Sequence, residues 1–95
     1  MKAKVNSLIS SRSGRPVANQ FKIETDKYYI FQSYNAIIAK VEKGFVGKVI
    51  LDPYYWDYSA TTLKYLKQFL GISYTKKEIE SFIKQGIYET KNLNI

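Results

Sequence analysis

The sequence predicts an α+β fold, in which an antiparallel sheet of about four to five strands is followed by a two-helix hairpin packed on one face of the sheet. Three observations support this class. Apolar and polar residues alternate with period two in the first half of the chain, which is typical of half-buried strands. Helix start and stop signals bracket two segments of the second half. The length of 95 residues suits one domain, so we expect a single α+β domain over residues 1–95.

The N-terminal segment, residues 1–19, is basic and contains a loop rich in serine and arginine. Residues 10–16 are Ser-Ser-Arg-Ser-Gly-Arg-Pro, a composition typical of turns. Pro16 disfavours a helical conformation at Arg15. The residues just before, Ser7 to Ser10, fit either a short strand or a helical turn, and the sequence leaves both open.

A β-hairpin is predicted over residues 20–34. Phe21 and Ile23 alternate with polar neighbours, and Thr25-Asp26 is a plausible tight turn. The second strand of this hairpin, residues 28–34, has aromatic residues on both faces, as expected of a central strand.

Two further strands are predicted after the hairpin. Residues 36–42 (AIIAKVE) fit a strand or a short helix, and their β-branched residues favour the strand. Residues 46–51 form a short apolar strand. It is expected to end at Asp52-Pro53, because proline cannot donate a hydrogen bond to a ladder.

The first predicted helix runs from Ala60 to Leu70. Ser59 is a candidate N-cap, and Gly71 stands where a left-handed residue commonly ends a helix. Leucines at 63, 66 and 70 share one face of this helix, which is therefore expected to pack on the sheet.

The second predicted helix runs from Lys76 to Gln85. Thr75 and Glu78 have the spacing of a capping box, and Gly86 closes the helix. Residues 87–90 are expected to form a last strand, and the tail, residues 91–95, to fray.

The absence of two residue types excludes much catalytic chemistry. The chain has no cysteine and no histidine, which excludes zinc fingers, disulfide scaffolds, thiol catalysis and Ser-His-Asp triads. Asp52 and Asp57 flank an aromatic segment, and we interpret them as turn or helix caps rather than a catalytic or metal-binding pair. We therefore expect no enzyme, no metal site and no cofactor.

Positive charge is concentrated near the N-terminus. The chain carries 15 Lys and Arg against 8 Asp and Glu, for a net charge of +7. The first acidic residue is Glu24, so the first 22 residues carry five cations and a charge of +5. A one-sided basic segment favours a polyanion partner, usually nucleic acid, although it also fits a solvated basic surface. The candidate phosphate contacts are Lys2, Lys4, Arg12, Arg15 and Lys22.

Aromatic residues are concentrated in the segment Pro53 to Tyr58. If exposed, they would form a base-stacking platform or the anchor of a protein interface. If buried, they would lock the junction between strand and helix, and we expect at least half of them to be buried. The candidate stacking or interface residues are Tyr54, Tyr55, Trp56 and Tyr58.

Three stretches, SSRSGRPVANQF (10–21), FQSYNAIIAK (31–40) and DPYYWDYSATTLKYLKQFLG (52–71), resemble a small uncharacterised domain family encoded by bacteriophages and related mobile elements. The resemblance covers the chain from about residue 6 to the second helix. It implies a viral or mobile-element origin and a place in the cytoplasm of a bacterial host. It transfers no catalytic or binding residue.

Two functions follow as hypotheses. The first is a phage-type accessory protein that binds nucleic acid through its basic N-terminal segment. The alternative is a phage-encoded inhibitor or adaptor that binds a host protein, such as a defence or transcription component, with the aromatic segment as its anchor. The sequence does not decide whether the protein forms a homo-oligomer. We expect no membrane partner, because the uncharged apolar runs are far shorter than a membrane span.

Overall fold

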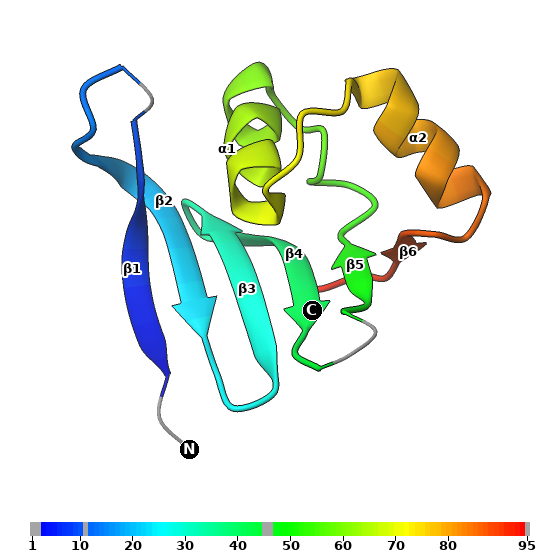
Figure 1. Ribbon diagram of the computed structural model, residues 1–95, viewed down its shortest axis with the longest axis horizontal. Coiled ribbons are helices and arrows are strands. Elements are labelled where there is room, and N and C mark those ends of the chain that lie inside the picture. The colour runs from blue at the N-terminus through cyan, green and yellow to red at the C-terminus, as the bar shows by residue number, and fades with distance from the viewer. Residues whose placement is uncertain (1–2, 11, 45–46, 95) are drawn as a thin grey trace.

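The computed structural model describes residues 3–10, 12–44 and 47–94 (Figure 1). One sheet of six strands carries two helices on one side, which confirms the α+β class with slightly more strands than expected. The elements in chain order are β1 (Lys4–Ile9), β2 (Pro16–Glu24), β3 (Tyr28–Ser33), β4 (Ala36–Glu42), β5 (Val49–Leu51), α1 (Ala60–Leu70), α2 (Lys76–Lys84) and β6 (Glu89–Thr90).

The first five strands form an antiparallel meander, in which each strand pairs with the next one along the chain. The last strand is different, because β6 pairs parallel with β5, with Ile50 opposite Glu89. Helices α1 and α2 therefore form the crossover that a parallel pair requires. The expected last strand is confirmed over Glu89–Thr90. The predicted antiparallel sheet is wrong in one respect, because the parallel β5–β6 pair makes the sheet a mixed one.

The N-terminal segment belongs to the sheet. Residues Lys4–Ile9 form β1, so the strand alternative is the one that the structure adopts. Strand β2 begins at Pro16, where Ile9 is its partner, and only from Gln20 onward does β2 also pair with β3. The start of β2 and the end of β1 thus form a two-stranded arm that extends beyond the rest of the sheet. Farther along, the predicted strand 46–51 is observed as Val49–Leu51, and residues 45 and 46 lie outside the described residues.

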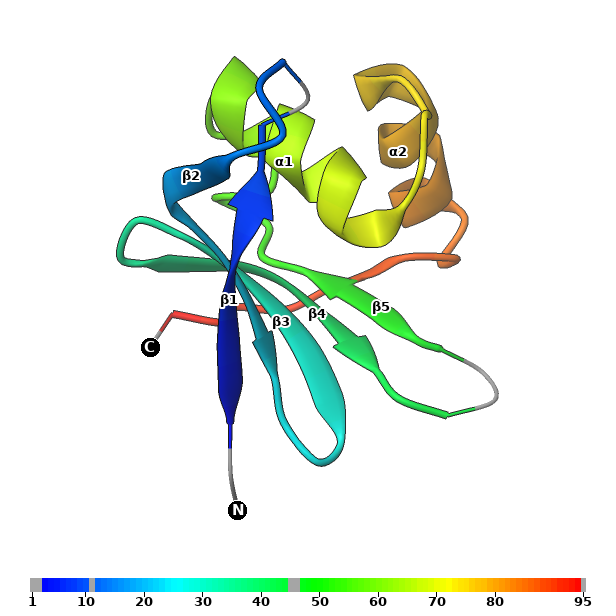
Figure 2. The same cartoon turned by 60° about the vertical axis from the view of Figure 1, so that its left-hand side comes forward.

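Helices α1 and α2 lie on one side of the sheet (Figure 2). The hydrophobic core lies between them and the sheet. Phe31 at the centre of β3 is fully buried and stacks on Phe69 of α1, with 5.7 Å between ring centroids. Buried side chains from β1, β4, β5, the loop after β5 and both helices complete the core: Leu8, Ile38, Ala39, Leu51, Trp56, Tyr65, Leu66 and Ile79.

In the part of the chain that the structure describes, neither helix covers the other face of the sheet. Strand register puts Phe21, Ile23 and Ile30 on this face, and each is half-buried. Tail residues Asn92 and Leu93 border it, since they line a shallow pocket together with residues of β3, β4 and β5. We call this surface the open face.

Both helices begin and end as their caps predict. The Ser59 side chain accepts the N–H of Thr62, and Gly71 ends α1 with a φ of 69°. At α2 both hydrogen bonds of the capping box between Thr75 and Glu78 are present. Helix α2 ends at Lys84, with Gln85 as its C-cap. Among the described residues, neither helix is long and apolar enough to cross a membrane.

Candidate functional site

The loop between β5 and α1 is shaped by one buried carboxylate. Asp52 follows β5 directly, and its Oδ1 accepts the backbone N–H groups of Tyr54 and Tyr55, each at 3.0 Å. The N–H of Trp56 then donates to the Asp52 carbonyl at 3.1 Å. These bonds curl the chain into a turn, so neighbouring aromatic side chains leave it in different directions.

This turn sends some of the four candidate aromatic side chains into the core and others to the surface. Trp56 enters the core and is only 6% exposed, so its indole is not available for stacking and leaves the set of candidate residues. Tyr55 is half-buried, whereas Tyr54 and Tyr58 are 66% and 63% exposed. The three tyrosine rings touch one another, with centroid separations of 4.7, 5.8 and 5.6 Å. We call Tyr54, Tyr55 and Tyr58 the tyrosine cluster.

A fourth tyrosine, which is not among the candidate site residues named above, stands in the turn between β3 and β4. Tyr34 is 62% exposed and has a φ of 52°, an uncommon value for a residue other than glycine. Its N–H donates to the Asn19 carbonyl at 2.7 Å, and its carbonyl accepts from the Gln32 side chain at 2.7 Å. The backbone that carries this exposed ring is therefore fixed at both its donor and its acceptor.

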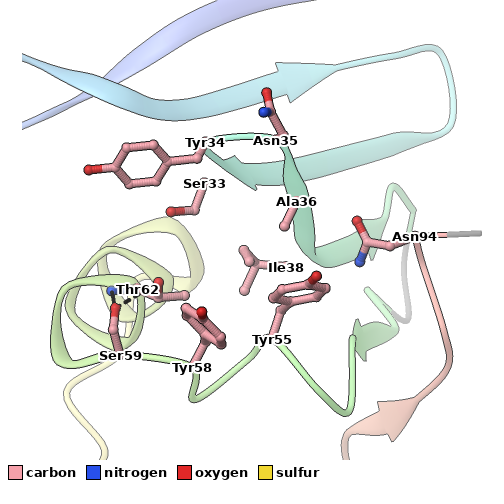
Figure 3. A pocket seen from close by; sticks show the side chains of 10 residues that line it. All are labelled: Ser33, Tyr34, Asn35, Ala36, Ile38, Tyr55, Tyr58, Ser59, Thr62 and Asn94. Carbon is pink, nitrogen blue, oxygen red and sulfur yellow. Dashed lines mark hydrogen bonds between the residues drawn. The ribbon is translucent and has the colours of Figure 1, made fainter.

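A pocket of about 330 Å³ lies between this turn and the tyrosine cluster (Figure 3). The sheet contributes one wall, the loop after β5 and the start of α1 contribute the other, and the tail closes one side. The lining residues are Ser33, Tyr34, Asn35, Ala36, Ile38, Tyr55, Tyr58, Ser59, Thr62 and Asn94. None of these carries a formal charge at neutral pH. We call this site the tyrosine pocket.

Two hydroxyl groups in the pocket are almost buried, since Ser33 and Thr62 are each 5% exposed. The Ser59 hydroxyl donates to Thr62 Oγ1 at 3.0 Å and accepts the N–H of Thr62 at 3.1 Å. The Thr62 hydroxyl therefore keeps its own hydrogen as a donor. The pocket offers neutral hydrogen-bonding groups beside aromatic walls.

The tail is held at this site, contrary to the expectation that residues 91–95 fray. The Asn94 side chain accepts the N–H of Ile37 at 2.6 Å and donates to the Ile37 carbonyl at 2.7 Å. Asp52 Oδ2 accepts the N–H of Leu93 and the Asn94 amide, each at 2.9 Å. Burial alone raises the pKa of the Asp52 carboxyl, but the hydrogen bonds from Leu93, Asn94, Tyr55 and Tyr54 together outweigh it and hold the pKa below its usual value.

The five predicted phosphate-contacting residues do not form one patch. Arg12 and Arg15 lie exposed in the turn that joins β1 to β2, which we call the arginine turn (residues 10–15). Lys4 lies at the opposite end of β1, about 17–20 Å away for a strand of this length. Lys22 pairs across the sheet with Phe31 in β3 and is half-buried. Lys2 lies outside the described residues.

The arginine turn and the tyrosines share one end of the sheet. The turn at Tyr34 and Asn35, the loop that follows β5 and the arm that carries the arginine turn all lie at the end where β3 finishes and β4 begins. The arm is tied to the helical layer by two bonds between Ile9 and the Gln68 side chain, at 3.1 and 2.7 Å. Exposed tyrosines and two arginines therefore face solvent from the same end of the molecule.

The other end of the sheet has a different electrostatic character. There Lys43 donates to Glu24 at 2.7 Å, and this hydrogen bond is the largest cause of the lowered pKa of Glu24, with Lys4 and Lys22 adding smaller effects. Lys22 and Lys43 both lie within 5 Å of the Tyr29 ring centroid. These cations are engaged with an acid and an aromatic ring, unlike the exposed arginines at the far end.

Two serines of the arginine turn, Ser10 and Ser13, already accept hydrogen bonds from the backbone of the turn. Ser10 Oγ accepts the N–H of Arg12 at 3.2 Å, and Ser13 Oγ accepts that of Arg15 at 3.3 Å. The Ser10 backbone also brackets the turn, with bonds to Gly14 and Arg15 at 2.9 Å. The two hydroxyls thus shape the turn, and the side chains of Arg12 and Arg15 remain exposed.

Comparison with known proteins gives a family and no function. No curated protein and no solved structure matches this chain. One family model matches residues 3–89, which include every strand up to Glu89, both helices, the arginine turn and the tyrosine cluster. The chain therefore belongs to a family of unknown function (DUF8033).

Proposed function

We propose that this protein binds single-stranded nucleic acid at the end of the sheet where the exposed tyrosines and the arginine turn lie. The observation that carries the proposal is the exposure of Tyr34, Tyr54 and Tyr58, each more than 60% accessible. Such exposure leaves the flat faces of the rings accessible to a partner. Exposed rings in and beside a pocket form a surface on which unpaired bases stack, irrespective of base identity.

Charge supports a polyanionic partner. The chain carries a net charge of +7, and Arg12 and Arg15 stand exposed at the same end as the tyrosines. Arginine binds phosphate oxygens in a bidentate manner, which positions a strand without selecting its sequence. In this arrangement the arginines hold the backbone and the tyrosines hold the bases. The function is binding, without a catalytic step.

The single-stranded form is favoured over a duplex because stacking requires bases that are free of their partners. A protein that recognises duplex DNA inserts a helix or a β-ribbon into the major groove. Helix α1 instead packs its apolar face on the sheet, where Leu66 is fully buried. The exposed tyrosine rings suit a flexible strand, whereas a duplex would be bound by the two-stranded arm of β1 and β2. The matched duplex in the test below measures that alternative.

A second candidate is the phage-encoded inhibitor or adaptor that binds a host protein in the bacterial cytoplasm. The open face favours it, since Phe21, Ile23 and Ile30 are half-buried there without a helix to cover them. The phage-type origin belongs to this proposal as well and rests on the sequence resemblance alone.

Binding of a fluorescein-labelled dT8 and of a matched duplex across a salt series tests the nucleic-acid function. We expect tighter binding of the single strand, with a log–log salt slope near 0.7 for each phosphate engaged. Replacing Arg12 and Arg15 by alanine should weaken binding and reduce the slope by about 1.4. The matched control replaces Lys77 and Lys84, two exposed cations of α2, and should leave the slope close to that of the wild type.

The tyrosines are tested by two double variants. Tyr54→Ala with Tyr58→Ala should weaken binding by about 5- to 150-fold for each stacked base lost, which corresponds to about 1–3 kcal/mol. Tyr54→Phe with Tyr58→Phe retains both rings and should bind nearly as the wild type does. Equal binding by all four double variants would contradict the proposed surface, and an absence of binding near physiological salt would favour the host-protein candidate.

A further inference from the structure

We infer that the tyrosine pocket receives one unstacked nucleobase of the bound strand, while the neighbouring bases stack on the exposed rings. This inference rests on the proposed function and adds to it a defined site for a single base. The tyrosine cluster and the pocket are continuous, because Tyr55 and Tyr58 belong to both. A strand that crosses the cluster therefore passes the mouth of the pocket (Figure 3).

The size of the pocket fits a small occupant. Its volume of about 330 Å³ lies at the lower end of the range of about 300–1,000 Å³ that is typical of small-molecule sites. A single base with part of its sugar is an occupant of this class. A folded protein segment would need a longer groove, as in the recognition of an added strand or helix.

The chemistry of the lining selects a neutral group rather than a phosphate. No lining residue carries a formal charge, and the cations of this end, Arg12 and Arg15, lie outside the lining. Tyr55 and Tyr58 supply aromatic surface, and Ala36 and Ile38 supply apolar surface. A flipped or unpaired base needs this combination, since it is bound by its flat faces and by hydrogen bonds to its edge.

Two hydroxyls are placed to bind the edge of the base. Ser33 on β3 and Thr62 on α1 approach the pocket from opposite walls (Figure 3), and both are 5% exposed. A serine hydroxyl donates and accepts, and Thr62 retains its hydrogen as a donor. The Asn94 amide is different, because Ile37 and Asp52 already use its oxygen and its nitrogen. We therefore assign recognition to Ser33 and Thr62 and a structural role to Asn94.

The experiment is an NMR titration of the ¹⁵N-labelled protein with two strands. The first probe is dT8, and the second is an eight-residue strand of the same sugar-phosphate backbone that lacks every base. With dT8 we expect the amide signals of Ser33, Ala36 and Ile38 to shift together with those of Arg12 and Arg15. With the abasic strand only the arginine-turn signals should shift, because the phosphates remain and the bases are gone.

The outcomes separate the inference from the function on which it rests. If dT8 binds and shifts the signals of Tyr54 and of the arginine turn but not those of Ser33, Ala36 and Ile38, the pocket inference is overturned and the proposed function stands. If the pocket signals shift equally with the abasic strand, the occupant is not a base, which also overturns the inference. If neither strand binds, the function and the inference fail together.

A conservative variant tests the same site independently. Ser33→Ala removes one hydrogen bond to the base and should weaken dT8 binding by about 2- to 12-fold, the range expected for one neutral hydrogen bond. It should not change the affinity for the abasic strand. Ser7→Ala, on an exposed position of β1, is the matched control and should bind both strands as the wild type does. An unchanged dT8 affinity of a folded Ser33→Ala variant would overturn the assigned role of Ser33.

Discussion

Replacing Asp52 by asparagine should destabilise the domain by about 2–4 kcal/mol. The side chain is 2% exposed and accepts four hydrogen bonds, from Tyr54, Tyr55, Leu93 and Asn94. Asparagine has one acceptor oxygen, so in either orientation of the amide two of these donors face an NH₂ group. Hydrogen bonds to a charged acceptor contribute about 1.5–3 kcal/mol each, and two lost bonds therefore cost about 3–6 kcal/mol. Relief from burying a charge offsets part of this loss.

The pH dependence of stability gives a second readout of the same residue. Because the pKa of folded Asp52 lies below its usual value of 3.8, its stabilising effect is present above the pKa of the unfolded chain. The effect is lost as the pH falls through the lower pKa of the folded state. The free energy of unfolding of the wild type should therefore decline below about pH 4, and this decline should be shallower in Asp52→Asn.

Urea unfolding followed by fluorescence measures both effects. Trp56 is the only tryptophan and lies in the core, so its emission reports global unfolding. Asp57→Asn is the matched control, because Asp57 is more exposed and forms an ion pair with Lys76 at 3.5 Å. It should change stability by less than about 0.5 kcal/mol. An Asp52→Asn variant as stable as this control, with an unchanged acid decline, would refute the argument that the four bonds outweigh the cost of burial.

Two further substitutions test the helical layer. Leu66→Ala should lower the free energy of unfolding by about 2–5 kcal/mol, because the fully buried side chain leaves a cavity against the sheet; Thr61→Ala, on the exposed side of the same helix, should stay within about 0.5 kcal/mol in the same urea titration. Thr75→Ala removes the N-cap of α2 and should cost about 1 kcal/mol, whereas Thr75→Ser retains the hydroxyl acceptor. If Thr75→Ala and Thr75→Ser lowered the free energy of unfolding equally, the capping hydrogen bond would not be the cause of the lost stability.

The features that the sequence predicted well depend on local interactions. The limits of α1 and α2 follow from Ser59, Gly71 and Thr75, whose hydrogen bonds join residues three or four positions apart. The interpretation of Asp52 as a turn cap is confirmed for the same reason, since Tyr54 and Tyr55 are its near neighbours. Such contacts are recognisable from spacing alone.

The features that were missed join distant parts of the chain. The tail is held by hydrogen bonds from Asn94 to Ile37, which is 57 positions away, and to Asp52, which is 42 positions away. No sequence pattern near residue 94 predicts these bonds. The tyrosine pocket likewise combines the β3–β4 turn, the loop after β5 and the tail. The Tyr-Asn pair at residues 34 and 35 between two strands is a signal for a turn, but it does not show that Tyr34 lines the same pocket as Tyr55 and Tyr58.

The parallel pairing of β6 has a consequence for the order of folding. Strands β1 to β5 pair with sequence neighbours through short turns, so the meander requires little loop closure. Pairing of Ile50 with Glu89 must instead close a loop of 39 positions that contains both helices, and such non-local contacts form late. During synthesis β5 is made before β6, so the edge of β5 stays unpaired until the residues after α2 have been added. Until then its unpaired backbone is a point at which two nascent chains can associate, and the Lys48–Glu89 ion pair at 2.9 Å forms only when the correct strand arrives.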